Sequence, residues 1–254
     1  MSNRIPLKKI SFSETSRADA LKTIDGFFNE DGGPSYIGVL NVRMAMQANK
    51  ELPELISYYN ESLLTVPDGM PLVWYGRALG YQKVARTCGP ELLADLLAVS
   101  GEKNYSHYFI GSTTETLAQL QKKISRRFPG ARILGAESPP FRPLSVEEVR
   151  AMADTINRQK PSFVWIGMSA PKQEFLIQRL LSLVETRTIF SGVGLAFDYL
   201  AGNVKKAPKI IQTLGLEWVW RFAQQPSKLT LRSLWRLFRF LPVLLRAVVL
   251  KKAM

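Results

Sequence analysis

Cysteine and histidine are nearly absent from this sequence. Its 254 residues contain one cysteine, Cys88, and one histidine, His107. A single cysteine allows no internal disulfide bond and no multi-cysteine metal site, and a single histidine excludes the two-histidine zinc motifs. The sequence therefore favours a reducing compartment.

Three other common signals are also missing. No run of about 18 or more uncharged apolar residues is present, although a membrane-spanning helix requires one. The polar residues 11–16 are unlike the apolar core of a secretory signal peptide. No Asp-x-Asp pair occurs, so the two-carboxylate hook for a metal-bound nucleotide is absent. We therefore expect no spanning helix, no signal peptide, no metal site and no cofactor.

The composition is otherwise that of a globular protein. Hydrophobic residues make up 46% of the chain and charged residues 22%, and 13 Phe, 5 Trp and 8 Tyr supply bulky core side chains. A chain of this length forms one large domain or two small ones.

Acidic residues are scarce at one end of the chain. The formal net charge is +13, and most of it lies in residues 199–254, where eleven Lys or Arg residues stand against one acid, Glu217. Such an excess points to an anionic partner: nucleic acid, a phosphorylated substrate or an anionic membrane surface.

The basic residues of this tail recur at helical spacing, opposite its apolar residues. The basic stripe is Lys228, Arg232, Arg236 and Arg239, and the apolar side is Leu231, Leu234, Trp235, Phe238 and Leu241. We expect Pro242 to kink or end this helix before a second apolar run, Val243 to Leu250. A basic, aromatic amphipathic helix is typical of binding to an anionic membrane surface.

Other interpretations of the tail are open. The helix can pack on the protein's own core with solvated arginines, and an exposed apolar tail can favour a homo-oligomer. Nucleic-acid binding is a third interpretation, but the apolar side is too large for a free duplex-binding helix. We therefore predict a membrane partner and no nucleic acid.

Short β-branched or aromatic runs alternate with longer helical patterns along the chain. The predicted strands are Tyr36 to Leu40, Leu63 to Val66, Tyr105 to Ile110, Arg132 to Leu134, Phe163 to Ile166 and Thr188 to Phe190. The predicted helices lie near Val42 to Tyr59, Met70 to Leu79, Glu91 to Val99, Glu115 to Arg127, Val146 to Gln159 and Gln173 to Leu183. Thr113 and Ser145 are plausible caps for two of them.

This alternation predicts an α/β fold with a Rossmann-like, mostly parallel sheet and helices on both faces. We divide the chain into a catalytic core, residues 1–200, and a basic helical appendage, residues 201–254. Ligands of such folds sit at the carboxyl ends of the strands. Four loops follow predicted strands there, and we expect them to line one cleft. They begin at Asn41, at Pro67-Asp68-Gly69, at Gly111-Ser112-Thr113-Thr114 and at Gly167.

Each loop has a structural and a functional interpretation. Pro67-Asp68-Gly69 is a turn tripeptide, and Asp68 is also placed to act as a general base at a strand end. Gly111 and Ser112 join a strand to a helix. The backbone N–H groups at the start of this helix either bind an anion such as phosphate or are satisfied by an ordinary cap at Thr113. Gly192 and Gly194 allow close packing or a tight turn.

Two further segments carry polar groups. From Gly167 the chain reaches Pro171, which suits a first helical turn, and then Gln173 and Glu174, which can bond sugar hydroxyls or a base edge or simply be solvated. Arg86 precedes another helix and is either a diphosphate clamp or a lone surface arginine. His107 lies inside a predicted strand and is expected to be a core residue.

Ordered blocks of residues extend over residues 37 to 234. The first blocks are Asn41, Pro67-Asp68-Gly69, Arg86 with Gly89, and Gly167 through Pro171-Lys172-Gln173-Glu174. The later ones are Gly192-Val193-Gly194-Leu195-Ala196-Phe197-Asp198, Ala201-Gly202, Lys206-Ala207-Pro208 and Gly215-Leu216-Glu217-Trp218 with Arg221. In this order they resemble the WecG/TagA/CpsF family of glycosyltransferases.

The resemblance implies an inverting, metal-independent transferase of cell-surface polysaccharide biosynthesis. It would move a sugar from a UDP-sugar to a polyprenyl-diphosphate-linked saccharide at the cytoplasmic face of the bacterial inner membrane. The donor is left open among UDP-N-acetylmannosamine, its uronic acid and UDP-glucose. The resemblance assigns the base to Asp68 and substrate contacts to Asn41 and Gln173, and it implies that the tail binds diphosphate through Arg221, with Lys228 and Arg232.

The sequence departs from the family pattern at a few positions. Val39 stands where Thr is common, Gln225-Pro226 where Glu-Pro is usual, Lys228 in place of Arg and Ser233 in place of Tyr. These changes leave Asp68 intact and bear on donor or acceptor choice. A catalytically inactive module that binds a nucleotide sugar or a membrane is therefore the alternative function.

Overall fold

The computed structural model describes residues 3–217, 219–220 and 239–249 of the chain. These residues belong to two compact units. Unit 1 comprises Met1–Asp19, Leu40–Cys88 and Lys206–Met254, and unit 2 comprises Ala20–Val39 and Gly89–Lys205. The predicted division into a catalytic core, residues 1–200, and a basic appendage, residues 201–254, is a division by function. It stays a prediction.

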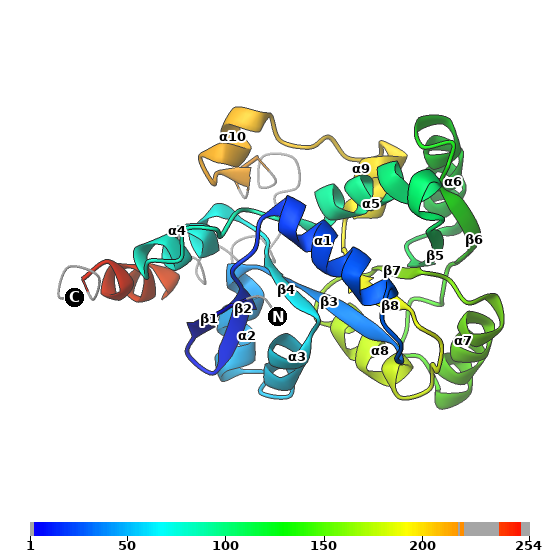
Figure 1. The fold of residues 1–254 in the computed structure, drawn as a ribbon, viewed down its shortest axis with the longest axis horizontal. Helices are drawn as coiled ribbons and strands as arrows, with labels where there is room; N and C mark the ends of the chain where they lie inside the picture. Colours follow the sequence, from blue (N-terminus) through cyan, green and yellow to red (C-terminus); the bar gives the residue numbers. More distant parts are fainter. Residues whose placement is uncertain (1–2, 218, 221–238, 250–254) are drawn as a thin grey trace. The chain divides into compact units, whose positions relative to one another are not determined.

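The centre of the fold is a sheet of six strands, in the order β4-β3-β8-β7-β5-β6 (Figure 1). The strands are β3 (Ser35–Leu40), β4 (Leu64–Pro67), β5 (Ser106–Gly111), β6 (Arg132–Glu137), β7 (Phe163–Gly167) and β8 (Ile189–Gly192). The pairings of β3 with β8, β8 with β7, β7 with β5 and β5 with β6 are parallel. The six predicted strands are confirmed and differ from the observed ones only at their ends.

Helices connect the strands and, in unit 2, cover both faces of the sheet. Figure 1 shows α5, α6 and α9 on one side and α7 and α8 on the other. The helices are α1 (Arg17–Phe28), α2 (Val42–Lys50), α3 (Leu55–Glu61), α4 (Met70–Ala78), α5 (Gly89–Lys103), α6 (Thr114–Arg127), α7 (Val146–Gln159), α8 (Lys172–Leu181), α9 (Ala196–Ala201) and α10 (Lys209–Thr213). The Rossmann-like α/β class is therefore confirmed.

Two helices begin at caps that the sequence predicts. Thr113 Oγ1 accepts a hydrogen bond from the backbone N–H of Thr116 at the start of α6. At the start of α7, Ser145 and Glu148 form a reciprocal capping box. Each cap satisfies backbone N–H groups that have no partner within the helix.

The prediction of one helix from Val42 to Tyr59 is wrong. The segment forms two helices, α2 and α3, and Pro53 lies between them. Proline disfavours helical backbone at the preceding residue and lacks an N–H, so the apolar pattern continues while the helix stops.

An N-terminal hairpin and helix α1 were not predicted. Strands β1 (Arg4–Leu7) and β2 (Ile10–Ser13) pair antiparallel in unit 1. Their apolar side chains are buried: Ile5, Leu7, Ile10 and Phe12. The hairpin packs beside β4, so this polar-looking segment supplies part of the core of unit 1.

Residues 239–249 of the predicted C-terminal appendage are helical. The helix of residues 239–249 includes Pro242, so the expectation that Pro242 ends it is wrong, while a kink at this residue stays a prediction. Phe240 and Ala247 are both buried, and the Phe240 ring centroid lies 6.0 Å from that of Tyr75 on α4. This face of the helix therefore packs against other residues of unit 1. Among the described residues, no helix is long and apolar enough to cross a membrane.

His107 is a buried core residue, as predicted. Trp165 Nε1 donates to His107 Nδ1 at 3.0 Å, so the proton of the neutral ring lies on Nε2, 2.7 Å from Ser100 Oγ. Burial lowers the pKa of His107 to about 3. The imidazole therefore joins β5, β7 and α5 through hydrogen bonds in its neutral form.

This burial predicts a loss of stability in mild acid. In the unfolded chain His107 has an ordinary pKa near 6.5, so below this pH the unfolded state binds a proton that the folded state does not bind. Stability is therefore complete above about pH 6.5 and falls by about 1 kcal/mol by pH 5.5. Urea unfolding at these two pH values measures the loss. The single imidazole NMR signal of the folded protein should not titrate in this range, and titration near pH 6.5 would contradict the account.

Candidate functional site

In unit 1, Asp68 lies directly beyond the end of β4. Its backbone N–H donates to the carbonyl of Leu40, the last residue of β3, at 2.7 Å. Pro67 is the last residue of β4, and Gly69 is the N-cap of α4. The predicted turn is therefore confirmed, and it holds a half-buried carboxylate between a strand and a helix.

Asn41 follows Leu40 and is the N-cap of α2. Its Oδ1 accepts from the backbone N–H of Met44 at 3.0 Å. This bond fixes the orientation of the amide and uses its acceptor, which leaves the NH2 group as the part suited to a ligand. Asn41 and Asp68 are thus brought to the same edge of unit 1 through the bond between Leu40 and Asp68.

Arg86 is not a lone surface arginine. Its Nη2 lies 2.5 Å from Glu217 Oε1, and the two side chains are 13% and 31% exposed. The backbone beside Arg86 is fixed as well, because Thr87 N–H donates to the carbonyl of Pro67 at 3.0 Å. This last bond ties the Arg86 loop to the residue before Asp68.

In unit 2, the ends of β5 and β7 lie close together. A Cβ atom on Gly111 would lie 2.7 Å from the carbonyl oxygen of Gly167, so a larger residue does not fit. Ser112 has a φ of 62°, which is uncommon for a residue other than glycine, and its carbonyl accepts from Ser138 Oγ at 2.7 Å. Unusual backbone of this kind often occurs at functional sites.

Gln173 is buried at the start of α8, with only 5% of its surface exposed. Its Oε1 accepts from the backbone N–H of Gly194 at 3.0 Å, and its Nε2 donates to Glu174 Oε1 at 3.1 Å. A Cβ on Gly192 would lie 2.6 Å from Gln173 Cδ, so the close-packing interpretation of Gly192 is confirmed. Pro171, expected in the first turn, is the N-cap of this helix.

Not all of the predicted site residues belong to the described part of the chain. Arg221, Lys228 and Arg232 lie outside the described residues. The structure brings together Asn41, Asp68 and Arg86 in unit 1, and Gly111, Gly167 and Gln173 in unit 2. The expectation that all four loops line one cleft stays a prediction. Within the described part of the chain, no three His, Cys, Asp or Glu residues are grouped to hold a metal ion.

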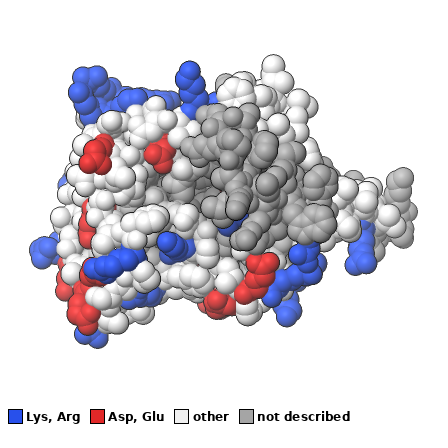
Figure 2. All heavy atoms as spheres, turned by 180° about the vertical axis from the view of Figure 1, so that it is seen from behind, with Lys and Arg blue, Asp and Glu red and all other residues white. Residues whose placement is uncertain are grey.

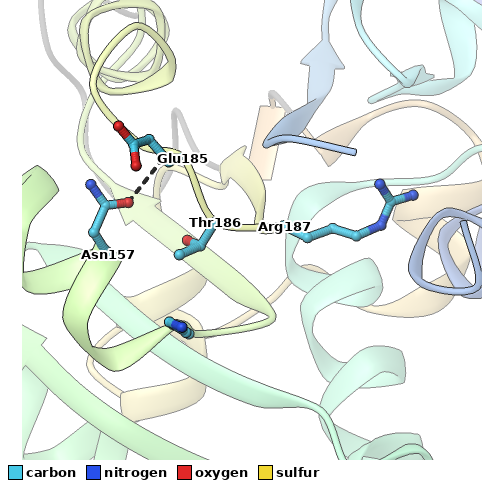
Figure 3. A pocket seen from close by; sticks show the side chains of 5 residues that line it. Asn157, Glu185, Thr186 and Arg187 are labelled. Carbon is cyan, nitrogen blue, oxygen red and sulfur yellow. Dashed lines mark hydrogen bonds between the residues drawn. The ribbon is translucent and has the colours of Figure 1, made fainter. Parts of the chain in front are cut away.

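A surface pocket lies at the other edge of unit 2 (Figure 3). Its residues precede β7 and β8 rather than follow them: Asn157, Lys160, Glu185, Thr186 and Arg187. The polar groups serve the fold, because Asn157 Oδ1 accepts from Glu185 N–H at 2.9 Å and Arg187 Nε donates to the carbonyl of Phe27 at 2.7 Å. In Figure 3 the Arg187 side chain points away from the other labelled residues. Since ligands of parallel sheets sit at the carboxyl ends, this pocket is separate from the candidate site.

Basic residues also gather at the end of α6. Lys122, Lys123, Arg126 and Arg127 are exposed there, and Figure 2 shows Lys and Arg atoms grouped over this region of the molecule. Cations near a helix C-terminus are stabilised by the helix dipole, which accounts for them without a ligand.

Sequence reasoning missed the partners of the site residues. Glu217 pairs with Arg86, and the backbone N–H of Gly194 orients Gln173. A signal for the first was present, because Glu217 is the one acid in the basic tail. No pattern in the sequence signals the second, since any residue but proline carries a backbone N–H.

One comparison with known families matches this chain. The model described as "Glycosyl transferase WecG/TagA/CpsF family" matches residues 5–253, nearly the whole chain. The matched range contains every residue of the candidate site.

The packing of Gln173 predicts the effect of a substitution at Gly192. Gly192→Ala places a methyl group within 2.6 Å of the Gln173 amide and must displace it or the strand. We expect a loss of stability of about 1–3 kcal/mol, measured by urea unfolding.

Gly26→Ala is the matched control. A Cβ on Gly26, within α1, meets no atom within 4 Å. The control should therefore leave stability unchanged or raise it by up to about 1 kcal/mol. Equal stability of the two variants would contradict the proposed packing of Gln173.

Proposed function

We propose that this chain, which belongs to the WecG/TagA/CpsF family of glycosyltransferases, moves a sugar from a UDP-sugar to a polyprenyl-diphosphate-linked saccharide. Membership of the family carries the class, a glycosyltransferase of cell-surface polysaccharide biosynthesis. The proposal adds the donor, the acceptor, inversion at the anomeric carbon and independence of metal ions. UDP-N-acetylmannosamine, its uronic acid and UDP-glucose are the candidate donors.

The placement of Asp68 is the observation that carries the proposal. A general base must be rigid and must reach the hydroxyl from which it takes a proton. Asp68 is fixed by its backbone bond to Leu40 and stands between β4 and α4. Its carboxylate takes the proton of the acceptor hydroxyl as the hydroxyl oxygen attacks the anomeric carbon.

The same step breaks the bond between the anomeric carbon and the diphosphate. Attack from the face opposite the leaving group inverts the configuration, and the electron pair of the broken bond leaves with UDP. Negative charge develops on the diphosphate, and a fixed guanidinium can stabilise it without a metal ion. We assign this role to Arg86, with Arg221, Lys228 and Arg232 of the tail.

Polar groups of the other predicted loops would bind the substrates. The free NH2 of Asn41 suits a sugar or phosphate oxygen, since its Oδ1 is used by Met44. We assign substrate contacts also to the Gly111-Ser112 and Gly167 backbones and to Gln173. Because Gln173 is bonded to Gly194 and Glu174, its contribution includes holding this loop in shape.

The C-terminal helix supports binding to a membrane surface. While Phe240 and Ala247 are buried, the apolar residues Leu241, Leu245, Val248 and Val249 are 51%, 55%, 42% and 66% exposed. Arg239 and Arg246 are exposed on the same helix. An apolar face with basic residues suits the surface of an anionic membrane, where a lipid-linked acceptor resides. We therefore propose a peripheral position at the cytoplasmic face of the inner membrane.

Replacement of Asp68 tests the catalytic proposal. Asp68→Asn keeps the size of the side chain and removes the base, so acceptor-dependent UDP release should fall about 100- to 10,000-fold. UDP affinity, measured by calorimetry, should change little because no diphosphate contact is lost. Both assays include EDTA, and Asp154→Asn, an exposed position on α7, is the control.

Two results would contradict the proposal. Unchanged turnover in Asp68→Asn would exclude Asp68 as the base. Binding of UDP by the wild-type protein, with no turnover of any UDP-sugar on a lipid-linked acceptor, would favour the inactive binding module.

Replacement of Leu245 tests the membrane proposal. Leu245→Glu adds a charge to the exposed apolar face, and we expect co-sedimentation with anionic vesicles to weaken about tenfold or more, because the burial of one leucine is worth about 1.5–3 kcal/mol. Val146→Glu, an exposed apolar position on α7, should bind vesicles like the wild type. Equal loss in both variants, or binding to duplex DNA in preference to vesicles, would overturn it.

A further inference from the structure

An ion pair of unit 1 joins two distant parts of the sequence. Arg86 and Glu217 lie 131 residues apart and are bonded at 2.5 Å. Arg86 is largely buried, so its charge is poorly solvated and depends on a nearby anion. In the structure Glu217 is such an anion.

Glu217 is unusual in its own segment. Residues 199–254 hold eleven Lys or Arg residues and no other acid. Its partner is Arg86, which lies in the loop between α4 and α5. The pair therefore fixes the beginning of the basic tail to that loop.

The loop that carries Arg86 is rigid on both sides. Ala85 N–H donates to the carbonyl of Thr15, and Thr87 N–H donates to the carbonyl of Pro67, each at 3.0 Å. Arg86 is thus held between the N-terminal region and the end of β4, next to Asp68. These bonds fix the backbone beside Arg86, and the contact with Glu217 orients its side chain.

A second contact brings the tail to the same place. Gly215 lies against α4, since a Cβ there would be 3.2 Å from Met70 Cβ and 3.0 Å from Trp74 Cη2. Gly215 also has a φ of 67°, which allows the chain to turn after α10. Gly215 therefore lies beside the start of α4, two residues after Asp68, and Glu217 contacts Arg86, whose neighbour Thr87 bonds to Pro67.

We infer that Glu217 is a positioning residue, whose carboxylate orients the Arg86 guanidinium and anchors the basic tail beside the Asp68 turn. The inference rests on the proposed function for one element only, the diphosphate as the ligand of Arg86. A guanidinium has five N–H donors in a planar fork, so it can hold a carboxylate and a phosphate oxygen together. Glu217 then sets the direction in which Arg86 meets the diphosphate.

Hydrogen exchange tests the anchor without any substrate. Glu217→Ala should speed amide exchange in residues 214–217 and 85–87 about tenfold, and Arg86→Ala should do the same. The exchanged pair, Arg86→Glu with Glu217→Arg, restores an ion pair and should restore slow exchange. Glu61→Gln, an exposed position at the end of α3, is the control. Unchanged exchange in Glu217→Ala would overturn the anchor.

UDP affinity of the same proteins tests the positioning role. Glu217→Ala should weaken UDP binding about fivefold, and Arg86→Ala should weaken it more. The double alanine variant should match Arg86→Ala alone, because Glu217 acts through Arg86. The exchanged pair should bind UDP as weakly as Arg86→Ala despite its slow exchange, since its cation has moved. Independent, multiplied losses in the double variant would overturn the positioning role.

Two further results keep the outcomes separate. Glu217→Gln keeps the shape of the side chain and removes its charge, so it replaces Glu217→Ala if that variant does not fold. It should also speed amide exchange and weaken UDP binding. A wild-type protein that binds no UDP and consumes no UDP-sugar would refute the proposed function and the positioning of a diphosphate. The exchange experiment would still decide whether Glu217 anchors the tail.

Discussion

Parallel pairing of short, buried strands is the constraint on which the rest of the structure depends. Parallel neighbours require a crossover, so each strand leads through a loop into a helix, and the loops after the strands meet at one edge of a sheet. Asp68 follows β4, Asn41 follows β3, and the loops of Gly111 and Gly167 follow β5 and β7. β3, β4, β5, β7 and β8 are almost wholly buried, which leaves the loops after them as the candidate positions for chemistry.

The polar groups of the site are held by the protein before any ligand arrives. Asn41 caps α2, Gln173 bonds Gly194 and Glu174, and Arg86 pairs with Glu217. These bonds keep each group in one orientation. The loss of side-chain entropy therefore occurs during folding rather than during binding. The proposed metal-independent transfer depends on this, because the cations must already point at the leaving diphosphate.

Much of this arrangement could be predicted from the sequence. The strands were found because β-branched and aromatic runs are bounded by turn residues, and the caps at Thr113 and Ser145 because each side-chain oxygen precedes a helical pattern. The hairpin of β1 and β2 was missed because its apolar residues become a core only against β4. The Arg86–Glu217 pair was missed because 131 residues of folding bring its members together. The contact of Phe240 with Tyr75 was missed for the same reason, because 165 residues separate the two rings in the sequence.

The anomeric configuration of the product tests the central claim most directly. The wild-type protein would be incubated with candidate UDP-sugars, a polyprenyl-diphosphate saccharide and EDTA, and the new glycosidic bond examined by NMR. Transfer by one displacement, with Asp68 as the base, predicts a single product of inverted configuration from one donor. A product of retained configuration, or transfer that requires a metal ion, would contradict the account.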